Sequence, residues 1–242
     1  MKINFKKVLR DNLFNLKWRC NICDEENFNG DYFCDECKNK LPILKENKCG
    51  HCGRLTAYSV DFCDSCIEKN VFIDKARSIF AYEEPIDNLI RAFKYKERLY
   101  LTDIFCDLFI EIYLTNFSDT DFITYVPASE KSLKERGYNQ SLVLAKALSE
   151  RIGISIVKTA IKTKETPRQA TLNFNERLEN LKGAFELEKV DFKGKNILLV
   201  DDVLTTGSTV ETLAKLFKKK GANKVYVLTI ASVSKIKFKD LK

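Results

Sequence analysis

The most regular hydrophobic pattern lies near the C-terminus, where residues 196–220 read NILLVDDVLTTGSTVETLAKLFKKK. The unbroken apolar run at 197–200 is typical of a strand buried on both faces of a parallel sheet. The apolar residues that follow the polar loop recur at the spacing of one helix face and are Val210, Leu213, Ala214 and Phe217. The lysines at the end of the segment and Gly221 after them predict the end of this helix.

Further elements are indicated upstream. Residues 123–127 (ITYVP) predict a strand followed by a helix over 138–152, and residues 89–95 (LIRAFKY) predict a helix that buries Leu89, Ile90 and Phe93. Cys106 lies in the apolar pattern 101–114 and is expected to be a buried helix residue. Together these patterns predict an α/β protein with a mostly parallel sheet and flanking helices.

We expect three parts along the chain. Residues 1–70 would form an N-terminal helix and a cysteine-rich module, residues 71–120 a connecting strand and helices, and residues 121–242 the α/β domain. The helix would carry an apolar stripe at Val8, Leu9, Leu13 and Leu16, which we expect to pack on the protein itself, although such a stripe can also touch a membrane or a partner.

Composition narrows the class of protein. The chain has 242 residues, 45% of them hydrophobic and 31% charged, with only 4 prolines and 9 glycines, so it should be globular. No apolar run suits a signal peptide or a bilayer span, so a cytoplasmic protein is expected. The net charge is +7, of which residues 1–70 carry +1 and the remainder +6, which mildly favours anionic ligands.

The cysteines form a repeated pattern. Eight of the nine lie before residue 67, in two quartets that each read C-x2-C-x10-C-x2-C. The first quartet is Cys20, Cys23, Cys34 and Cys37, and the second is Cys49, Cys52, Cys63 and Cys66. Two such pairs can complete a tetrahedral thiolate site, so the spacing predicts two structural zinc sites.

Alternative readings of the cysteines are weaker. A cytoplasmic chain disfavours disulfides, and a redox enzyme of the thioredoxin type would need one such pair, not four. Gly53 suits a knuckle because its backbone can take positive φ, and Asp24 stands at the equivalent place in the first quartet. His51 is expected not to be a ligand. Spacing leaves open whether ligands pair within or between quartets, and we expect pairing within each.

The loop between the C-terminal strand and helix predicts an anion site. Backbone amides converge at a helix N-terminus, where the helix dipole adds positive potential. The loop residues that supply amides and hydroxyls for a phosphate are Thr205, Thr206, Gly207, Ser208 and Thr209. Asp201 and Asp202 precede them at the end of the strand, where carboxylates can accept hydrogen bonds from a sugar. Acids beside a phosphate site indicate a phosphorylated ribose.

Other phosphate-related motifs fit less well. A Walker P-loop requires G-x-x-x-x-G-K-[ST], and this loop has no such lysine. A response-regulator acidic pocket needs a phosphoacceptor Asp on a later strand, whereas one predicted strand is left here. A purely structural turn remains as the third alternative.

The same segment strongly resembles the motif of type I phosphoribosyltransferases that binds 5-phosphoribosyl 1-pyrophosphate (PRPP). Residues 122–148, 162–187, 89–95 and the cysteine module are similar to the ComF family of competence proteins, so the resemblance covers nearly the whole chain. It implies a type I phosphoribosyltransferase-like fold.

The resemblance also implies further site residues. A second loop, after the strand 123–127, would hold the pyrophosphate through Lys131, Lys134, Arg136 and Gly137, with Gly137 opening the helix 138–152. A solvated basic turn is the alternative. A flexible loop over 162–177 would carry Arg168, expected to be catalytic with Asp201 and Asp202, and Gln169. Lys94 matches a ComF pattern but has no evident role.

Three functions are compatible with these features. The ComF resemblance favours a PRPP-binding module of DNA uptake and natural transformation that works with single-stranded DNA, a competence helicase and a recombination mediator. An active phosphoribosyltransferase with unknown acceptor, using Mg²⁺ carried mostly by PRPP, is the first alternative, and a salvage enzyme is the second. The ribbons would contact DNA or protein. Aromatic residues available for base stacking are Tyr32, Phe33, Tyr58 and Phe62, and lysines available for the DNA backbone are Lys215 and Lys218–Lys220.

Overall fold

The computed structural model describes residues 19–27, 31–44, 48–67, 71–95, 98–164, 181 and 183–234. The N-terminal apolar stripe, Arg168 and Gln169 lie outside these residues. The chain divides into two compact units, Met1–Leu41 and Pro42–Lys242. Within the described ranges, none of the helices combines the length and the apolar character needed to cross a bilayer.

The first unit is a small cysteine-rich module. An antiparallel bridge joins Arg19 to Glu26, and the helix α2 (Asp35–Asn39) carries one of the cysteines, Cys37. Asp24 has φ 62°, a conformation that L residues rarely adopt outside tight turns. In the residues that the structure describes, turns around the cysteines therefore shape this module.

The second unit is built on a four-stranded parallel sheet with the strand order β1-β6-β5-β2. The strands are β1 (Lys75–Ala81), β2 (Phe122–Tyr125), β5 (Asn196–Leu204) and β6 (Lys224–Ser232). The central strands β5 and β6 are almost entirely buried, as the continuous apolar run in β5 predicts. This sheet confirms the α/β prediction.

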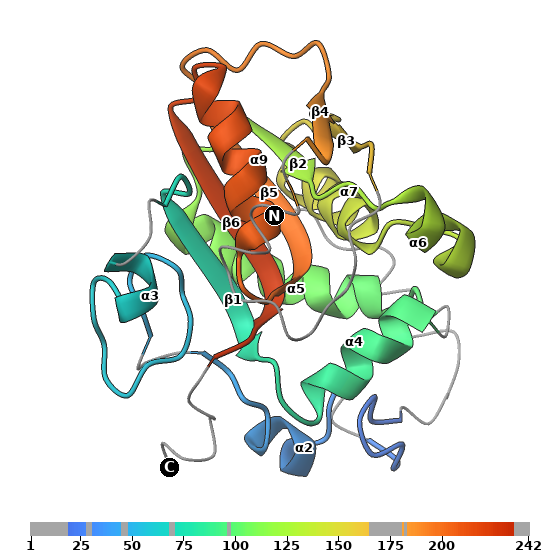
Figure 1. Cartoon of the computed structure of the whole chain (residues 1–242). Helices are drawn as coiled ribbons and strands as arrows, with labels where there is room; N and C mark the ends of the chain where they lie inside the picture. Colours follow the sequence, from blue (N-terminus) through green and yellow to red (C-terminus); the bar gives the residue numbers. More distant parts are fainter. Residues whose placement is uncertain are drawn as a thin grey trace. The chain divides into compact units, whose positions relative to one another are not determined.

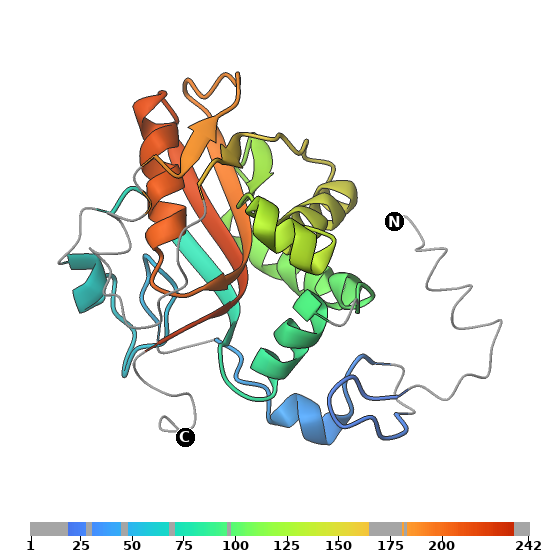
Figure 2. The ribbon, with the colours of Figure 1, turned by 45° about the vertical axis from the view of Figure 1, so that its right-hand side comes forward.

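Helices cover both faces of the sheet. In Figure 2, α9 (Ser208–Lys219) lies on one side, and α5 (Leu101–Asn116) and α7 (Gln140–Ile152) lie on the other. The predicted apolar face of α9 is buried in one cluster with alternate residues of β5, among them Ile197 and Leu199. The helix ends as predicted, because Gly221 has φ 92° just after its last turn.

The remaining elements extend this layered unit (Figure 1). They are α3 (Asp64–Ile67), α4 (Ile86–Tyr95), α6 (Glu130–Arg136) and an antiparallel pair formed by β3 (Ala160–Lys162) and β4 (Phe185–Leu187). The residues predicted to be buried in α4 and α5 are buried, Cys106 included. The carboxyl ends of β5 and β2 lie at one edge of the sheet, where ligands of open parallel sheets bind.

One local prediction is wrong. Gly137 does not open the long helix; it ends α6 with φ 77°, its amide donating to the carbonyl of Leu133. The helix α7 begins three residues later, and Asn139 caps it by accepting hydrogen bonds from the amides of Ser141 and Leu142. An Asn side chain is a strong N-cap, which explains why the chain restarts its helix there and not at the glycine.

Candidate functional site

The predicted phosphate loop joins β5 to α9. We use this name for Thr205–Thr209, which leaves the sheet after Leu204 and enters the helix at Ser208. Gly207 is the N-cap residue, with φ 85° and no side chain to cap the helix. The Ser208 amide donates to Thr206 Oγ1 at 3.5 Å, and Gly207 offers no side chain to the amides that follow, so the first turn of this 12-residue helix keeps amides for an anion.

The side chains of the loop form a small polar cluster. The hydroxyls of Thr206 and Ser208 lie 2.9 Å apart, and Thr205 is exposed. Ser208 is buried, so its hydroxyl is held in place, while Thr206 and Thr209 are partly exposed. The loop thus offers amides and two ordered hydroxyls on one side of the β5 end.

The two acids, which we call the acid pair, stand at the end of β5 with defined partners. The hydroxyl of Ser141 donates to Asp201 Oδ1 at 2.7 Å, and the Asp202 amide donates to the same oxygen at 2.9 Å. Lys94 Nζ lies 2.6 Å from Asp202 Oδ2, and the two side chains are only 20% and 12% exposed. Three elements, α4, α7 and β5, therefore meet at the acid pair.

The surroundings of Asp201 make its carboxyl group harder to ionise than that of an exposed aspartate. Burial of its carboxyl group, with the negative charge of Asp202 beside it, raises the pKa of Asp201 to about 7. The Ser141 hydrogen bond and the charge of Lys94 oppose this rise but do not cancel it. Asp201 therefore changes its protonation state near neutral pH, next to Asp202 and Lys94.

Ser141 and the role of Lys94 are the parts of this site that the sequence did not predict. Lys94 sits in an amphipathic helical pattern in which an exposed cation looks ordinary, and it is 108 residues before Asp202. Ser141 occupies the first turn of α7, where serine is common at any helix start. The spacing of residues within one segment gives no indication that α4, α7 and β5 meet at one point.

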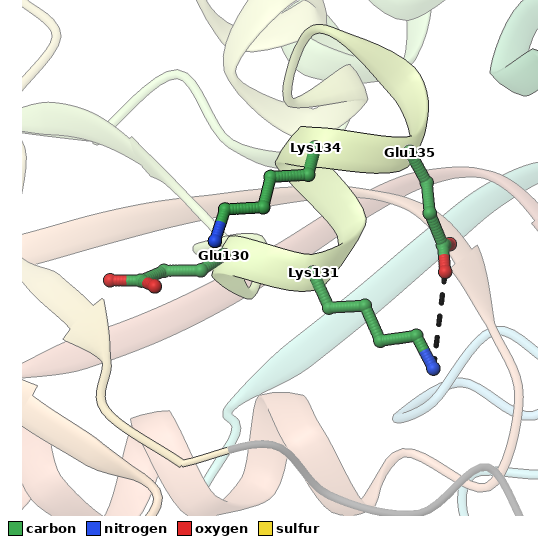
Figure 3. Close-up of a pocket in the computed structure, with 4 residues that line it drawn as sticks. All are labelled: Glu130, Lys131, Lys134 and Glu135. Atoms are coloured by element: carbon green, nitrogen blue, oxygen red, sulfur yellow. Dashed lines mark ion pairs between the residues drawn. The ribbon is translucent and has the colours of Figure 1, made fainter.

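The basic turn predicted to hold pyrophosphate is the helix α6. Figure 3 shows four charged side chains of this helix around a shallow pocket: Glu130, Lys131, Lys134 and Glu135. Lys131 is 71% exposed and lies 4.0 Å from Glu135. The pocket thus holds equal numbers of acids and bases, and it is less basic than the sequence pattern suggested.

Arg136 points to a different set of partners. Its guanidinium lies 4.9 Å from the centre of the Tyr95 ring and donates to the Tyr95 hydroxyl at 3.0 Å. It also donates to Gln140 Oε1 at 3.2 Å. Arg136 therefore ties α6 to the end of α4, one residue from Lys94, so it braces the neighbourhood of the acid pair.

The cysteines of each quartet converge on one point. Within each group the four sulfurs lie within 4.8 Å of one another, which confirms pairing within quartets. All eight are free of disulfides. A zinc ion with sulfurs at ~2.3 Å needs sulfur-to-sulfur edges of about 3.8 Å. The observed distances are 3.8 Å for Cys23–Cys34, 3.7 Å for Cys52–Cys63 and Cys63–Cys66, and 4.0 Å for Cys49–Cys66.

The knuckles around these sulfurs also fit a metal. Amides of Ile22 and Cys63 point at cysteine sulfurs, at 3.5 Å and 3.2 Å, as they do where thiolates are stabilised. Gly53 has φ 68°, as predicted. His51 is not part of the quartet; its ring stacks on Phe62 at 5.2 Å. Four thiolates close the coordination sphere, so both sites are of the structural kind.

The second ribbon, residues 48–67, is attached to the edge of the sheet. The Ala76 amide of β1 donates to the His51 carbonyl at 2.7 Å, and the Leu55 amide donates to Ser234 Oγ at 2.9 Å. A Cβ added at Gly53 would lie 2.6 Å from the Ala76 carbonyl oxygen. Glycine is therefore required where the knuckle meets the strand.

The aromatic residues of the ribbons differ in exposure. Tyr58 and Phe62 of the second ribbon are 70% and 51% exposed. Phe33 of the first ribbon is buried, so it is not available to stack on a base. Tyr32 is partly buried, and its carbonyl accepts a hydrogen bond from the Asn21 side chain at 2.8 Å.

Comparison with known proteins agrees with this architecture. Residues 11–75 match the model of the double zinc ribbon domain, and residues 139–241 match that of the phosphoribosyl transferase domain. Competence protein F of Haemophilus influenzae is 31% identical over 222 residues, covering 82% of this chain and 96% of that protein. DNA utilization protein YhgH of Escherichia coli is 31% identical over 200 residues, covering 80% and 87%.

A third relative comes from a different bacterium. Competence protein ComFC of Bacillus subtilis is 25% identical over 195 residues, covering 78% of each chain. The phosphate loop and the acid pair fall inside the matched phosphoribosyl transferase domain, and all eight clustered cysteines fall inside the matched zinc ribbon domain. The chain therefore belongs to the ComF family of competence proteins, which joins a double zinc ribbon to a domain of the type I phosphoribosyltransferase fold.

Proposed function

We propose that this protein binds PRPP at the carboxyl end of β5 and takes part in the handling of incoming DNA during natural transformation. The observation that carries the proposal is the acid pair placed just before the N-terminus of α9, where the N-cap residue Gly207 has no side chain. Carboxylates for ribose hydroxyls and amides for a phosphate are the two requirements of a phosphorylated sugar.

In this proposal each part of the loop has one task. The 5′-phosphate accepts hydrogen bonds from the amides and hydroxyls of the phosphate loop. The ribose hydroxyls donate to Asp201 and Asp202, so Lys94 must share or release Asp202 when the sugar binds. Mg²⁺ would be held mainly by PRPP oxygens and water, and it would neutralise the pyrophosphate.

The pyrophosphate end is proposed to lie toward α6. Lys131, Lys134 and the Gly137 turn supply charge and an open backbone there, while Arg136 braces the turn against Tyr95. Because Glu135 pairs with Lys131, a pyrophosphate must compete with that carboxylate. Arg168, which lies outside the described residues, is proposed to act with Asp201 and Asp202 in the transfer of the phosphoribosyl group to an acceptor.

A calorimetric titration tests the PRPP proposal. Mg²⁺ and PRPP are titrated into the zinc-loaded wild type, into the Asp201→Asn/Asp202→Asn variant and into Glu186→Gln, a control acid on β4. Binding to the wild type and the control, with loss in the double variant, is expected. Failure of the folded, zinc-loaded wild type to bind would refute the proposal.

Contact with single-stranded DNA is proposed for the second ribbon. Its support is the pair of exposed aromatic side chains, Tyr58 and Phe62, in a chain whose relatives include a protein named for DNA utilization. Stacking on such side chains is worth about 1–3 kcal/mol per base. Lys219 and Lys220 are exposed and could meet phosphates, whereas Lys218 already pairs with Asp74 at 2.8 Å.

Fluorescence anisotropy with a labelled oligonucleotide tests the DNA proposal. Binding should weaken as salt rises, and Tyr58→Ala/Phe62→Ala should bind more weakly than Tyr100→Ala, a control at another exposed tyrosine. Equal affinity of the ribbon variant and the control would reassign the aromatic pair to a protein contact. The helicase and the recombination mediator implied by family membership would then be the partners to test.

A further inference from the structure

The second ribbon reaches the phosphate loop through one side chain. Arg54 follows Cys52 by two residues, and its Nη2 donates to the carbonyl of Thr205 at 2.9 Å. This hydrogen bond joins residues 151 positions apart in the chain. The bond places a guanidinium at the residue where β5 gives way to the loop.

The ribbon fixes the backbone from which Arg54 extends. The Cys49 amide donates to the Arg54 carbonyl at 2.9 Å, so the residue belongs to the knuckle itself. Gly53, just before it, packs against the Ala76 carbonyl of β1. The backbone from which the guanidinium extends is thus held between the cysteine cluster and β1.

The guanidinium also lies against the helix N-cap. A Cβ added at Gly207 would be 3.2 Å from Arg54 Nη2. Glycine suits position 207 for two reasons: its φ is 85°, and it has no side chain in the space that Arg54 fills. The amides of the first turn of α9 begin one residue later.

One donor of the guanidinium has no partner in the part of the chain that the structure describes. Its Nε is buried, and no acceptor for it exists among the described residues. Among the described residues, none of the ion pairs joins Arg54 to a carboxylate. A buried donor without an acceptor is costly, so the contacts within the protein do not fully satisfy this guanidinium, whose Nη2 lies at the loop.

We propose that Arg54 is a phosphate-binding residue of the PRPP site, supplied by the second zinc ribbon to the 5′-phosphate held in the phosphate loop. This inference rests on the proposed function. A planar, permanently charged guanidinium beside the N-terminus of a helix is well matched to a phosphate monoester. It gives the ribbon a direct part in ligand binding, so the cysteine cluster also sets the geometry of the phosphate site.

Separate titrations of the two ends of PRPP test the inference. Ribose 5-phosphate, inorganic pyrophosphate with Mg²⁺, and PRPP with Mg²⁺ are titrated into the wild type, Arg54→Gln and Arg54→Ala. The control is Arg19→Gln, an arginine beside the first quartet whose hydrogen bonds go to Asp24. Gln can still donate to the Thr205 carbonyl but carries no charge. Arg54→Gln therefore separates the hydrogen bond that holds the loop from a charged contact with the phosphate.

Both Arg54 variants should bind ribose 5-phosphate and PRPP about tenfold more weakly or worse, because a charge-assisted hydrogen bond is lost. Their affinity for pyrophosphate should not change, and Arg19→Gln should match the wild type. Metal content, measured with a colorimetric chelator, should stay equal in all four proteins. If a variant loses zinc, Arg54→Lys is titrated in its place. The inference then still requires that Arg54→Lys binds ribose 5-phosphate more weakly than the wild type does while it keeps its zinc.

Several results would overturn the inference. Wild-type affinity of Arg54→Gln for ribose 5-phosphate would exclude a charged contact, while the PRPP site itself would stand. An equal loss for pyrophosphate would mean that the change disturbs the whole domain. A wild type that binds none of the three ligands would refute the proposed function, and this inference with it.

Discussion

The ion pair between Lys94 and Asp202 can be tested by a double-mutant cycle. The substitutions are Lys94→Met, which keeps the aliphatic stem, and Asp202→Asn, which keeps the shape of the acid. The two groups are 2.6 Å apart and each is at least four-fifths buried. Removing one partner leaves the other charge poorly solvated, next to Asp201.

The size of the effect follows from distance and burial. Two unit charges ~4 Å apart attract by about 4 kcal/mol at an effective dielectric constant near 20, and the cost of desolvating both groups offsets more than half of this. We therefore expect each single substitution to lower the free energy of unfolding by about 2–3 kcal/mol, at or below the ~3–5 kcal/mol of a fully buried pair, because both side chains keep some contact with water. The double variant should lose less than the sum, with a coupling energy of about 1–2 kcal/mol.

Urea unfolding at pH 8 without ligand provides the assay. A matched control cycle uses Arg91 and Asp87, an ion pair on α4 at 3.0 Å in which the arginine is 63% exposed. That pair should couple by about 0.3–0.5 kcal/mol, as exposed helix pairs do. Coupling between Lys94 and Asp202 no larger than in the control would refute the reasoning that the acid pair is held by a buried cation.

Three further outcomes are expected. Because the pKa of Asp201 is raised to about 7, its carboxylate fraction grows between pH 6 and 8, so PRPP affinity should rise over this window in calorimetry, and the rise should be smaller in Asp201→Asn. Cys52→Ser should lower the zinc content from two ions to one per chain, measured by metal analysis; loss of both would contradict independent sites. Gly53→Ala should lower the free energy of unfolding by about 2 kcal/mol or more, because of positive φ and the Ala76 clash, whereas Gly153→Ala, with positive φ but open space, should lose about 1 kcal/mol.

Much of the fold could be predicted because its signals are local. The apolar run in β5 and the helical spacing in α9 each describe a short segment, and burial of those residues follows from periodicity alone. The cysteine spacing is equally local, so the two quartets and the positive φ of Gly53 were predictable. The loop at the helix N-terminus was found for the same reason.

The rest of the site depends on contacts between distant segments. Lys94 reaches Asp202, Ser141 reaches Asp201 and Arg54 reaches Thr205, and none of these pairs shares a period or a motif. Gly137 was predicted to open the helix over 138–152, but with positive φ it ends α6, and the N-cap Asn139 sets the start of α7. Side-chain partners, unlike element types, are set by the tertiary fold.

Hydrogen exchange with mass spectrometry tests the central claim most directly. The zinc-loaded protein is compared with and without PRPP and Mg²⁺, and amides of peptides covering the phosphate loop and the first turn of α9 are followed. If PRPP binds there, these amides should exchange more slowly when the ligand is present, while those of β3 should not change. Unchanged exchange in the phosphate loop at saturating PRPP would contradict the claim that this loop is the phosphate site.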